Sequence, residues 1–511
     1  MRTPRLLLLI FASAALACSS PALAATYYVD SVAGSDGNPG TSPEQAWQSL
    51  NKVNAQSFGP GDQILLKAGS AWNGQELRPR GSGGAAEPIV VNMYDTGNKP
   101  QINCEGAYLN AVYLYNIEYW ELNNLDITNT APSPMANQHG VFVQADGTGT
   151  LHHIHLKDLD VHDVNGHLTE GDDQAKNNGG IIVDSRGALR SSFDDVLIEG
   201  CSVINVDKSG IKTWSAWPRC KGQTWEPHIN VVIRDNVLDD IAGDGIVTAH
   251  CDGALVEYNV ASRCHMYPNG AYVAMWTWDC ANCVFQYNEA YDTRHTSDGQ
   301  AWDIDAFCNN ITFQYNYSHD NHGGFMLLVS CEFCTDNVVR YNISQNDMFR
   351  LLRVHGPVTN TSVYNNVFYI GPQAGNPTII DHTGSGQNGI YYRNNIFYNM
   401  GNGGYDYSGS NVVFDYNVFY GNHPSSEPPD AHKLTSDPKF VAPGTASVGR
   451  DTCAGYKLQP DSPCIDSGMT IPDGGGRDFW GNPVPFGPAT DRAAHEYRPL
   501  DTPTLLEAHP N

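Results

Sequence analysis

Three features are scarce in this sequence, and each scarcity excludes a class of protein. After residue 24 no apolar run approaches the roughly 20 residues that a transmembrane helix needs, so we expect no membrane partner. Basic residues are few, with 29 Lys and Arg against 55 Asp and Glu in 511 residues. A formal charge of −26 without basic clusters excludes nucleic acids as partners. Long amphipathic stretches are also nearly absent, which argues against a helical fold.

The first residues have the pattern of a secretory signal peptide. A basic start precedes an apolar run, and Ala22-Leu23-Ala24 forms an A-x-A cleavage site. We therefore expect residues 1–24 to be removed and the chain to be secreted, either outside the cell or into a periplasm. The alternative is a lipoprotein-like cleavage before Cys18. Removing residues 1–24, which hold two arginines and no acid, takes the formal charge from −26 to −28.

An asparagine recurs at the end of short β-rich segments from about residue 230 onward. Successive copies are separated by 23, 29, 28, 26, 24, 29 and 22 residues. The eight positions are Asn236, Asn259, Asn288, Asn316, Asn342, Asn366, Asn395 and Asn417. After most of them a short turn leads to a second apolar strand, so each repeat is expected to contain two strands.

A period in the twenties with short strands predicts a solenoid. The leucine-asparagine pattern of leucine-rich repeats is absent, and a propeller needs a period of about 40–45 residues. The remaining candidate is an all-β fold, a single-stranded right-handed parallel β-helix whose coils stack about 4.8 Å apart. Asparagine suits a fixed corner of such coils, because it tolerates a left-handed turn and can form an amide ladder.

Cysteines supply a second test of this register. Four of them lie eight residues before the asparagine of their coil, and these are Cys251, Cys280, Cys308 and Cys334. We expect them to form one column in which neighbours are within disulfide reach, as suits an exported protein. The alternatives are free thiols packed as small apolar groups, or zinc bound by the two Cys-x-x-Cys pairs.

The two ends of the mature chain differ from the repeats. Ser42 can cap a short helix over "PEQAWQSLNKVN", which would cover the open end of the solenoid. We expect residues 25–100 to form this N-terminal helical cap and the first coils, 101–425 the repeats, and 426–511 an irregular C-terminal cap.

Both ends also carry motifs known from one superfamily. The start, "YYVDSVAGSDGNPGT" with "GDQILLKAG", and the end, "DPKF", "LQPDSPCIDSG" and "DRAAHE", resemble the secreted pectate-lyase-like β-helix proteins. The resemblance covers nearly the whole mature chain. It implies the β-helix fold but not one chemistry, because the superfamily includes hydrolases, lyases, epimerases and binding proteins.

The stretch "QAWDIDAF" (residues 300–307) places two carboxylates in an otherwise apolar strand. Asp303 and Asp305 alternate with Trp302, Ile304 and Ala306. Because ionised carboxylates in a narrow core would be too costly, the aspartates should face outward, with α-carbons about 6.6–7 Å apart. Inverting glycosidases hold two carboxyls about 6.5–9.5 Å apart, so we predict a catalytic pair. A solvated surface or structural calcium are the alternatives.

Neighbouring coils offer further groups that fall on the same expected face. We predict His355 as a third catalytic residue. Tryptophan faces stack on sugar rings and polar groups orient hydroxyls, which indicates a substrate-binding surface. Its predicted members are Lys212, Trp214, His250, Trp276, His322 and Arg353. For the histidines, an ordinary turn or surface position is the alternative.

The segment "DGQAWDIDAFCNNITFQYNYSHDNHGGFMLL" resembles part of secreted β-helix glycoside hydrolases, including enzymes that act on fucosides and xylans. The N-T-D, S-H-G and R-x-K motifs of polygalacturonases are absent, so pectin hydrolysis is not implied. Our leading hypothesis is a secreted glycoside hydrolase acting on a polysaccharide or oligosaccharide. It would need no cofactor and would be a monomer.

Two other functions remain open at this stage. One is a polysaccharide lyase acting on a uronate polymer, in which Asp303 and Asp305 hold calcium and Lys212, Arg353 or His355 serves as the base. The other is a β-helix protein that binds carbohydrate without cleaving it.

Overall fold

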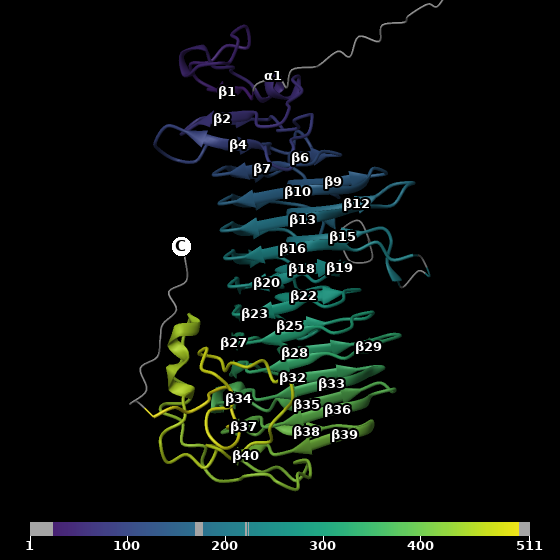
Figure 1. Cartoon of the computed structure of the whole chain (residues 1–511), viewed down its shortest axis with the longest axis vertical. Coiled ribbons are helices and arrows are strands. Elements are labelled where there is room, and N and C mark those ends of the chain that lie inside the picture. The colour runs from purple at the N-terminus through teal and green to yellow at the C-terminus, as the bar shows by residue number, and fades with distance from the viewer. Residues whose placement is uncertain (1–23, 169–176, 220–221, 223, 500–511) are drawn as a thin grey trace, which may run out of the picture.

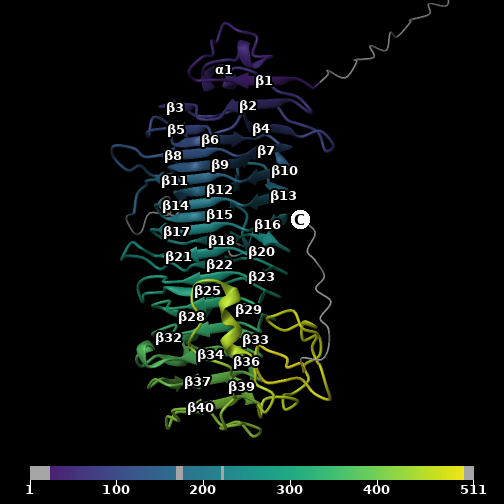
Figure 2. The same ribbon diagram turned by 90° about the vertical axis from the view of Figure 1, so that its left-hand side faces the viewer.

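Three parallel sheets run along the long axis of the molecule, and a complete coil contributes to all three (Figure 1, Figure 2). The computed structural model describes residues 24–168, 177–219, 222 and 224–499. The predicted signal peptide therefore lies outside the described residues, except for its last position. The right-handed parallel β-helix and its helical N-terminal cap are confirmed, but the prediction of two strands per coil is wrong.

The first sheet contains the strands that come just before the repeated asparagines. Its strands are β1 (Thr26–Val29), β2 (Gln63–Lys67), β4 (Ile89–Tyr94), β7 (Trp120–Asn123), β10 (Gly149–Lys157), β13 (Ser191–Glu199), β16 (His228–Arg234), β19 (Cys251–Asp252), β20 (Leu255–Glu257), β23 (Val284–Gln286), β26 (Thr312–Gln314), β29 (Cys334–Thr335), β30 (Val338–Arg340), β33 (Val358–Tyr364), β36 (Asn388–Arg393) and β39 (Ser410–Asp415).

The second sheet was missed in the sequence because its strands are short and follow the asparagine directly. Its strands are β3 (Ala71–Asn73), β5 (Gln101–Asn103), β8 (Asp126–Asn129), β11 (Asp160–Val164), β14 (Ser202–Val206), β17 (Val237–Ile241), β21 (Val260–Ser262), β24 (Glu289–Tyr291), β27 (Tyr317–His319), β31 (Ile343–Gln345), β34 (Val367–Ile370), β37 (Ile396–Asn399) and β40 (Val418–Gly421).

The third sheet contains the strand of "QAWDIDAF". Its strands are β6 (Asn110–Tyr115), β9 (His139–Asp146), β12 (Gly179–Arg186), β15 (Ser209–Ser215), β18 (Ile246–Ala249), β22 (Met275–Trp278), β25 (Gln300–Ile304), β28 (Gly324–Val329), β32 (Arg350–His355), β35 (Thr378–Thr383) and β38 (Gly404–Asp406).

The repeated asparagines form a continuous ladder inside the coils. All eight are buried, and the side-chain amide of each donates to the side-chain oxygen of the next at 2.9–3.1 Å. The same oxygen also accepts from the backbone N–H of the preceding asparagine, for example Asn288 N to Asn316 Oδ1 at 2.9 Å. The ladder ends on the carboxylate of Asp430, which accepts from the Asn417 amide at 2.9 Å.

The left-handed turn conformation falls one residue earlier than expected. Tyr258, Tyr287, Tyr315 and Tyr341 have φ between 51° and 58°, and each directly precedes a ladder asparagine. This residue turns the chain so that the asparagine side chain points inward, and the asparagine itself keeps an ordinary φ. The predicted ladder is confirmed, whereas the predicted left-handed asparagine is wrong.

The cysteine column is present, but its thiols are free. Isolated parallel bridges from Asp252 through Ala281 and Asn309 to Thr335 bring the four predicted cysteines into register. Cys251, Cys280, Cys308 and Cys334 are buried free thiols, so the disulfide prediction is wrong for this structure. Side chains stacked in register point the same way at about 4.8 Å spacing, whereas a disulfide needs its Cβ atoms about 3.8 Å apart. Burial raises the pKa of the Cys308 and Cys334 thiols, which disfavours the reactive thiolate.

The N-terminal cap contains two short helical pieces instead of one helix. A 3-10 turn, η1 (Pro43–Gln45), precedes α1 (Leu50–Asn54), which is capped by Ser49 and not by Ser42. Trp47 interrupts the helix because its backbone pairs with Tyr28 and Asp30, and its buried ring stacks on Tyr27 at 4.8 Å. Tertiary pairing has overridden local helix propensity.

The C-terminal segment packs along the side of the solenoid (Figure 1, Figure 2). After the short helix η4 (Pro372–Ala374) and strand β40, the chain returns through a second helix, η5 (Arg450–Tyr456). Phe440, Tyr456 and Phe479 pack against outward tyrosines of the lower coils, such as Tyr317 and Tyr341. In the described part of the chain, no helix has the length and apolar character needed to cross a membrane.

The ladder predicts a large difference between two asparagines of one coil. Asn316→Ala removes the oxygen that accepts from the buried backbone N–H and side-chain amide of Asn288, and one of the donors to Asn342 Oδ1, so it should cost about 2–4 kcal/mol of unfolding free energy. Asn310→Gly removes an exposed amide but keeps the left-handed backbone at φ 56°, so it should cost under about 1 kcal/mol. Chemical denaturation monitored by circular dichroism measures both, and equal losses would contradict the structural role of the ladder.

Candidate active site

The outer face of the third sheet carries the two predicted aspartates. On β25, Trp302 and Ile304 point into the core, as predicted. Asp303 points outward, in register between Trp276 on β22 and Leu327 on β28. The strand alternation therefore places this carboxyl group on the sheet surface, away from the apolar interior.

Asp303 lies at the centre of a group of four carboxyl groups. Its side chain is only 4% exposed, and its pKa is raised well above the usual range by burial and by the charges of Asp305, Asp298 and Asp244. We call these four aspartates the carboxylate cluster. Asp298 and Asp305 are partly exposed, whereas Asp244 is buried and accepts a hydrogen bond from Val273 N at 3.0 Å. Neighbouring negative charges and low polarity both favour a proton on Asp303.

Polar atoms around Asp303 lack protein partners. Among the described residues, Asp303 Oδ1 and the indole Nε1 of its in-register neighbour Trp276 are buried and form no hydrogen bond. An unpaired buried polar group costs about 1–3 kcal/mol. Two such groups on adjacent strands are suited to a ligand that carries hydroxyl groups.

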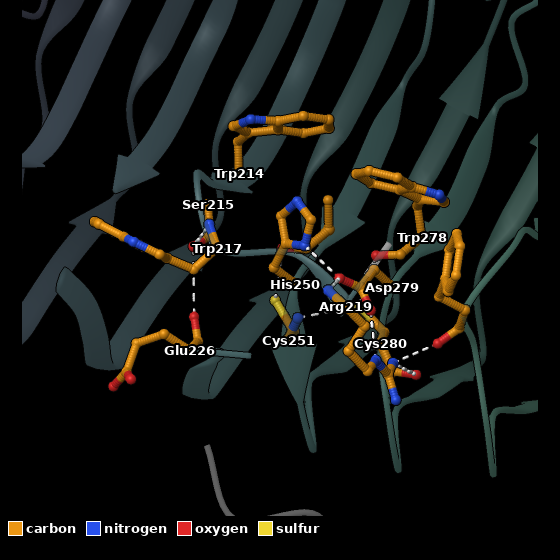
Figure 3. Close-up of polar contacts among 12 residues, drawn as sticks. Trp214, Ser215, Trp217, Arg219, Glu226, His250, Cys251, Trp278, Asp279 and Cys280 are labelled. Carbon is orange, nitrogen blue, oxygen red and sulfur yellow. Dashed lines mark hydrogen bonds and ion pairs between the residues drawn. The ribbon is translucent and has the colours of Figure 1, made fainter. Parts of the chain in front are cut away.

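Two tryptophans extend this face next to the cluster (Figure 3). Trp214 on β15 and Trp278 on β22 stack with ring centroids 5.1 Å apart and planes at 16°. Ala249 on β18 is in register with Trp278 and leaves room between them. Asp305 of the next coil donates its backbone N–H to Thr277 O at 3.0 Å, and Trp278 is the residue after Thr277. Trp278 and Asp305 are therefore neighbours in adjacent coils. The aromatic rings and the carboxylate cluster thus belong to one continuous surface.

His250 packs against both tryptophans and shares the buried carboxylate of Asp279 with Arg219 (Figure 3). His250 is 0% exposed, contacts both rings edge-on, and its Nδ1 lies 3.0 Å from the buried carboxylate of Asp279. Arg219 pairs with the same carboxylate at 2.5 Å and donates to Asn309 Oδ1 at 2.9 Å. This arginine connects the loop after β15 to the residues that follow β22 and β25.

Two predicted substrate-binding residues are buried instead of exposed. A left-handed φ of 57° at His250 turns its buried ring under the tryptophans. Lys212 is 4% exposed, and its ammonium group lies 4.4 Å from the Trp214 ring centroid. The structure places both residues against the Trp214 ring, and their direct contact with a substrate stays a prediction.

The remaining predicted residues lie on the same face but farther from Asp303. Arg353 lies two coils beyond Asp303, because Leu327 of the coil between them is in register with both. Arg353 pairs with Asp381 at 3.5 Å. His355 ends β32 in an exposed position and its Nδ1 lies 2.9 Å from Thr383 Oγ1. His322 lies in the turn before β28, 3.8 Å from Asp292. The face brings Trp276, Asp303 and Asp305 together, while His355 stands apart from the cluster.

Sequence reasoning missed the contributions of the turns. Asp298 precedes Gly299, whose φ of 85° starts β25, and Asp244 lies at the start of β18. Their charges, from turns of different coils, raise the pKa of Asp303. The recurrence of Asp or Asn at the turn before each third-sheet strand was the available signal. Two cavities of about 620 and 550 Å³ lie elsewhere, beside the C-terminal segment and beneath the N-terminal cap, and neither includes a member of the cluster.

The raised pKa of Asp303 predicts a pH-dependent effect of Asp303→Asn. Below the ordinary aspartate pKa of 3.8 the carboxyl is neutral in both folded and unfolded chains, so the variant should have wild-type stability. As the pH rises above 3.8, ionisation of the unfolded chain stabilises it while burial keeps folded Asp303 protonated, so wild type loses stability relative to Asp303→Asn. Melting temperatures at pH 3.5 and 7 test this. A variant less stable than wild type at pH 7 would contradict a protonated Asp303.

The Arg219 ion pair predicts a destabilisation that an exposed pair does not share. Arg219→Met leaves the buried Asp279 carboxylate without its arginine and should cost about 3–5 kcal/mol. The matched control is Arg263→Met, which breaks a more exposed pair with Asp239 and should cost at most about 1 kcal/mol. Urea denaturation gives both values, and the Trp214 and Trp278 fluorescence should change only in Arg219→Met.

The chain is similar to enzymes that act on glycosides. No family model matches the sequence. A lacto-N-biosidase of Bifidobacterium longum subsp. longum is 28% identical over 472 residues, covering 74% of this chain and 29% of the relative. The chain therefore spans less than a third of the length of that curated relative.

Solved structures agree with this similarity. XylC in complex with xylose, at 11% identity and a TM-score of 0.51 over 92% of this chain and 98% of that one, shares the fold alone. The crystal structure of GH136 lacto-N-biosidase from Eubacterium ramulus is 30% identical with a TM-score of 0.61, covering 71% of this chain and 67% of that one. At that level of identity over two thirds of the solved enzyme, the chain belongs to glycoside hydrolase family 136.

Proposed function

We propose that this protein hydrolyses a glycosidic bond in an oligosaccharide and releases lacto-N-biose, with Asp298 and Asp305 as the catalytic carboxyl groups. The single observation that carries the proposal is the grouping of Asp303 with three other carboxyl groups, beside a partly exposed pair of tryptophans. The name of the two similar enzymes supplies the substrate class.

Accessibility selects the two catalytic groups within the carboxylate cluster. Glycoside hydrolysis needs one carboxyl that protonates the leaving oxygen and one carboxylate that attacks the anomeric carbon or activates water. Both must touch the sugar, and Asp298 and Asp305 are the partly exposed members. This assignment replaces Asp303 of our predicted pair by Asp298.

Asp303 then acts as a positioning residue between the two catalytic groups. Burial and the neighbouring carboxylates raise the pKa of its carboxyl, which favours the uncharged form beside the two catalytic groups. Its unpaired Oδ1 and the unpaired Trp276 Nε1 can accept from and donate to sugar hydroxyls. The stacked rings of Trp214 and Trp278 provide an apolar platform for a sugar face.

The charge of the site argues for a neutral sugar over a uronate. A lyase must neutralise the substrate carboxylate, whereas this face presents four carboxyl groups within a chain of formal charge −26. No observation favours the lyase or the purely binding protein. Calcium binding remains a prediction, and the N-terminal sequence supports export as part of this proposal.

The experiment is hydrolysis of the 4-nitrophenyl β-glycoside of lacto-N-biose, with parallel assays of the glycosides of its two single sugars and of alginate and polygalacturonate. We expect nitrophenol release from the disaccharide only. Asp298→Asn and Asp305→Asn should each lower kcat/KM by at least about 10³-fold, equivalent to roughly 4 kcal/mol of transition-state stabilisation.

Asp252→Asn is the matched control, because Asp252 is a partly exposed aspartate on the first sheet, away from the cluster. It should retain wild-type kcat/KM. Unsaturated products absorbing in the ultraviolet would identify a lyase. Wild-type kcat/KM in Asp298→Asn or in Asp305→Asn would refute the assignment of these two residues.

A further inference from the structure

A second group of chemically active side chains lies on a different face of the solenoid, the outer surface of the first sheet. Glu121 on β7, and His153 and His155 on β10, bring one ligand atom each within 4.8 Å of one another. Among the described residues they are the one group of three or more His, Cys, Asp or Glu side chains that closes this tightly. All three are partly buried.

Strand register brings these residues together from successive coils. Glu121 is the in-register partner of His155, so their side chains project from the same face of neighbouring strands. In a regular strand His153 and His155, two residues apart, project from the same face. His153 and Asp195 lie opposite each other with left-handed φ values of 55° and 70°, and the pairing of β10 with β13 skips both without a change of register. With this shared kink the two imidazole rings lie 3.8 Å apart.

Asp195 holds both rings from the next coil. Its two oxygens lie 2.7 Å from His153 Nδ1 and 3.0 Å from His155 Nε2. When Asp195 accepts a hydrogen from each ring, the free lone pairs are on His153 Nε2 and His155 Nδ1. His153 Nε2 faces Glu121 Oε1 at 3.3 Å. A carboxylate that orients ligand histidines through their other nitrogen is the usual arrangement behind a bound metal ion.

Glu121 supplies the carboxylate of this group. Its Oε1 faces His153 Nε2, while its Oε2 pairs with Lys157. Lys157 lies 2.9 Å from Glu121 Oε2, so it leaves Oε1 for a metal while weakening the attraction of the site.

From this geometry we propose that Glu121, His153 and His155 bind one divalent transition-metal ion, with zinc as the probe, and that Asp195 positions the two histidines. Two imidazoles and one carboxylate suit zinc and its neighbours better than calcium or magnesium, which prefer oxygen ligands. The bound ion would connect the coils of β7 and β10 and, through Asp195, that of β13. The proposal is independent of the proposed catalytic function.

The test is titration of the full chain, first stripped with a chelator, with zinc chloride in a calorimeter at pH 7.5. We expect one equivalent bound with a Kd at or below about 10 µM, and a rise in melting temperature that the chelator reverses. His155→Gln and His153→Asn, in which asparagine tolerates the left-handed backbone, should each lose that equivalent. Asp195→Asn should bind about 10–100-fold more weakly.

His152→Gln is the matched control, because His152 is on the same strand but pairs with Glu118. It should bind zinc as wild type does. Absence of an equivalent in wild type, or its retention in both histidine variants, would overturn the proposal.

Cobalt gives a readout that needs no variant. Its visible absorption when bound to the wild-type chain should show nitrogen and oxygen ligation without a thiolate charge-transfer band. A thiolate band from the bound equivalent would place the metal on a cysteine and also overturn the proposal.

Discussion

The in-register stacking of the coils is the constraint on which every other feature depends, and the asparagine ladder is its most specific element. Each ladder asparagine donates twice to the side-chain oxygen of the next one, through its side-chain amide and through its own backbone N–H. A one-residue slip would leave these buried groups unpaired and turn outward side chains inward. The ladder therefore fixes which residues of distant sequence meet on each face.

This constraint explains why the fold was predictable and where the prediction stopped. The spacing of residues such as Asn288 and Asn316 is a repeated local signal, so the solenoid, its register and the cysteine column were all visible in the sequence. The second sheet was not, because a segment such as "EAY" (Glu289–Tyr291) is too short to show a periodicity. The broken cap helix depends on the pairing of Trp47 with Tyr28, which no local pattern contains.

The candidate site was predictable only where strand alternation decides it. Asp303 faces outward because Trp302 and Ile304 face inward, and this follows from a period of two. The contribution of Asp298 and Asp244 depends on turns from different coils. His250 and Lys212 were expected at the surface, but backbone conformation and packing against Trp214 bury them. The same limit applies to His153, whose position depends on a left-handed kink that it shares with Asp195.

The small residue between the two stacked tryptophans has a consequence for how such a surface can diversify. Ala249 separates Trp214 from Trp278 along the sheet, so the two indoles meet over a methyl group. A bulkier side chain there would push the two indole rings apart and divide one broad aromatic surface into two narrow ones. The shape of the surface proposed to hold a sugar therefore depends on a single methyl-sized position.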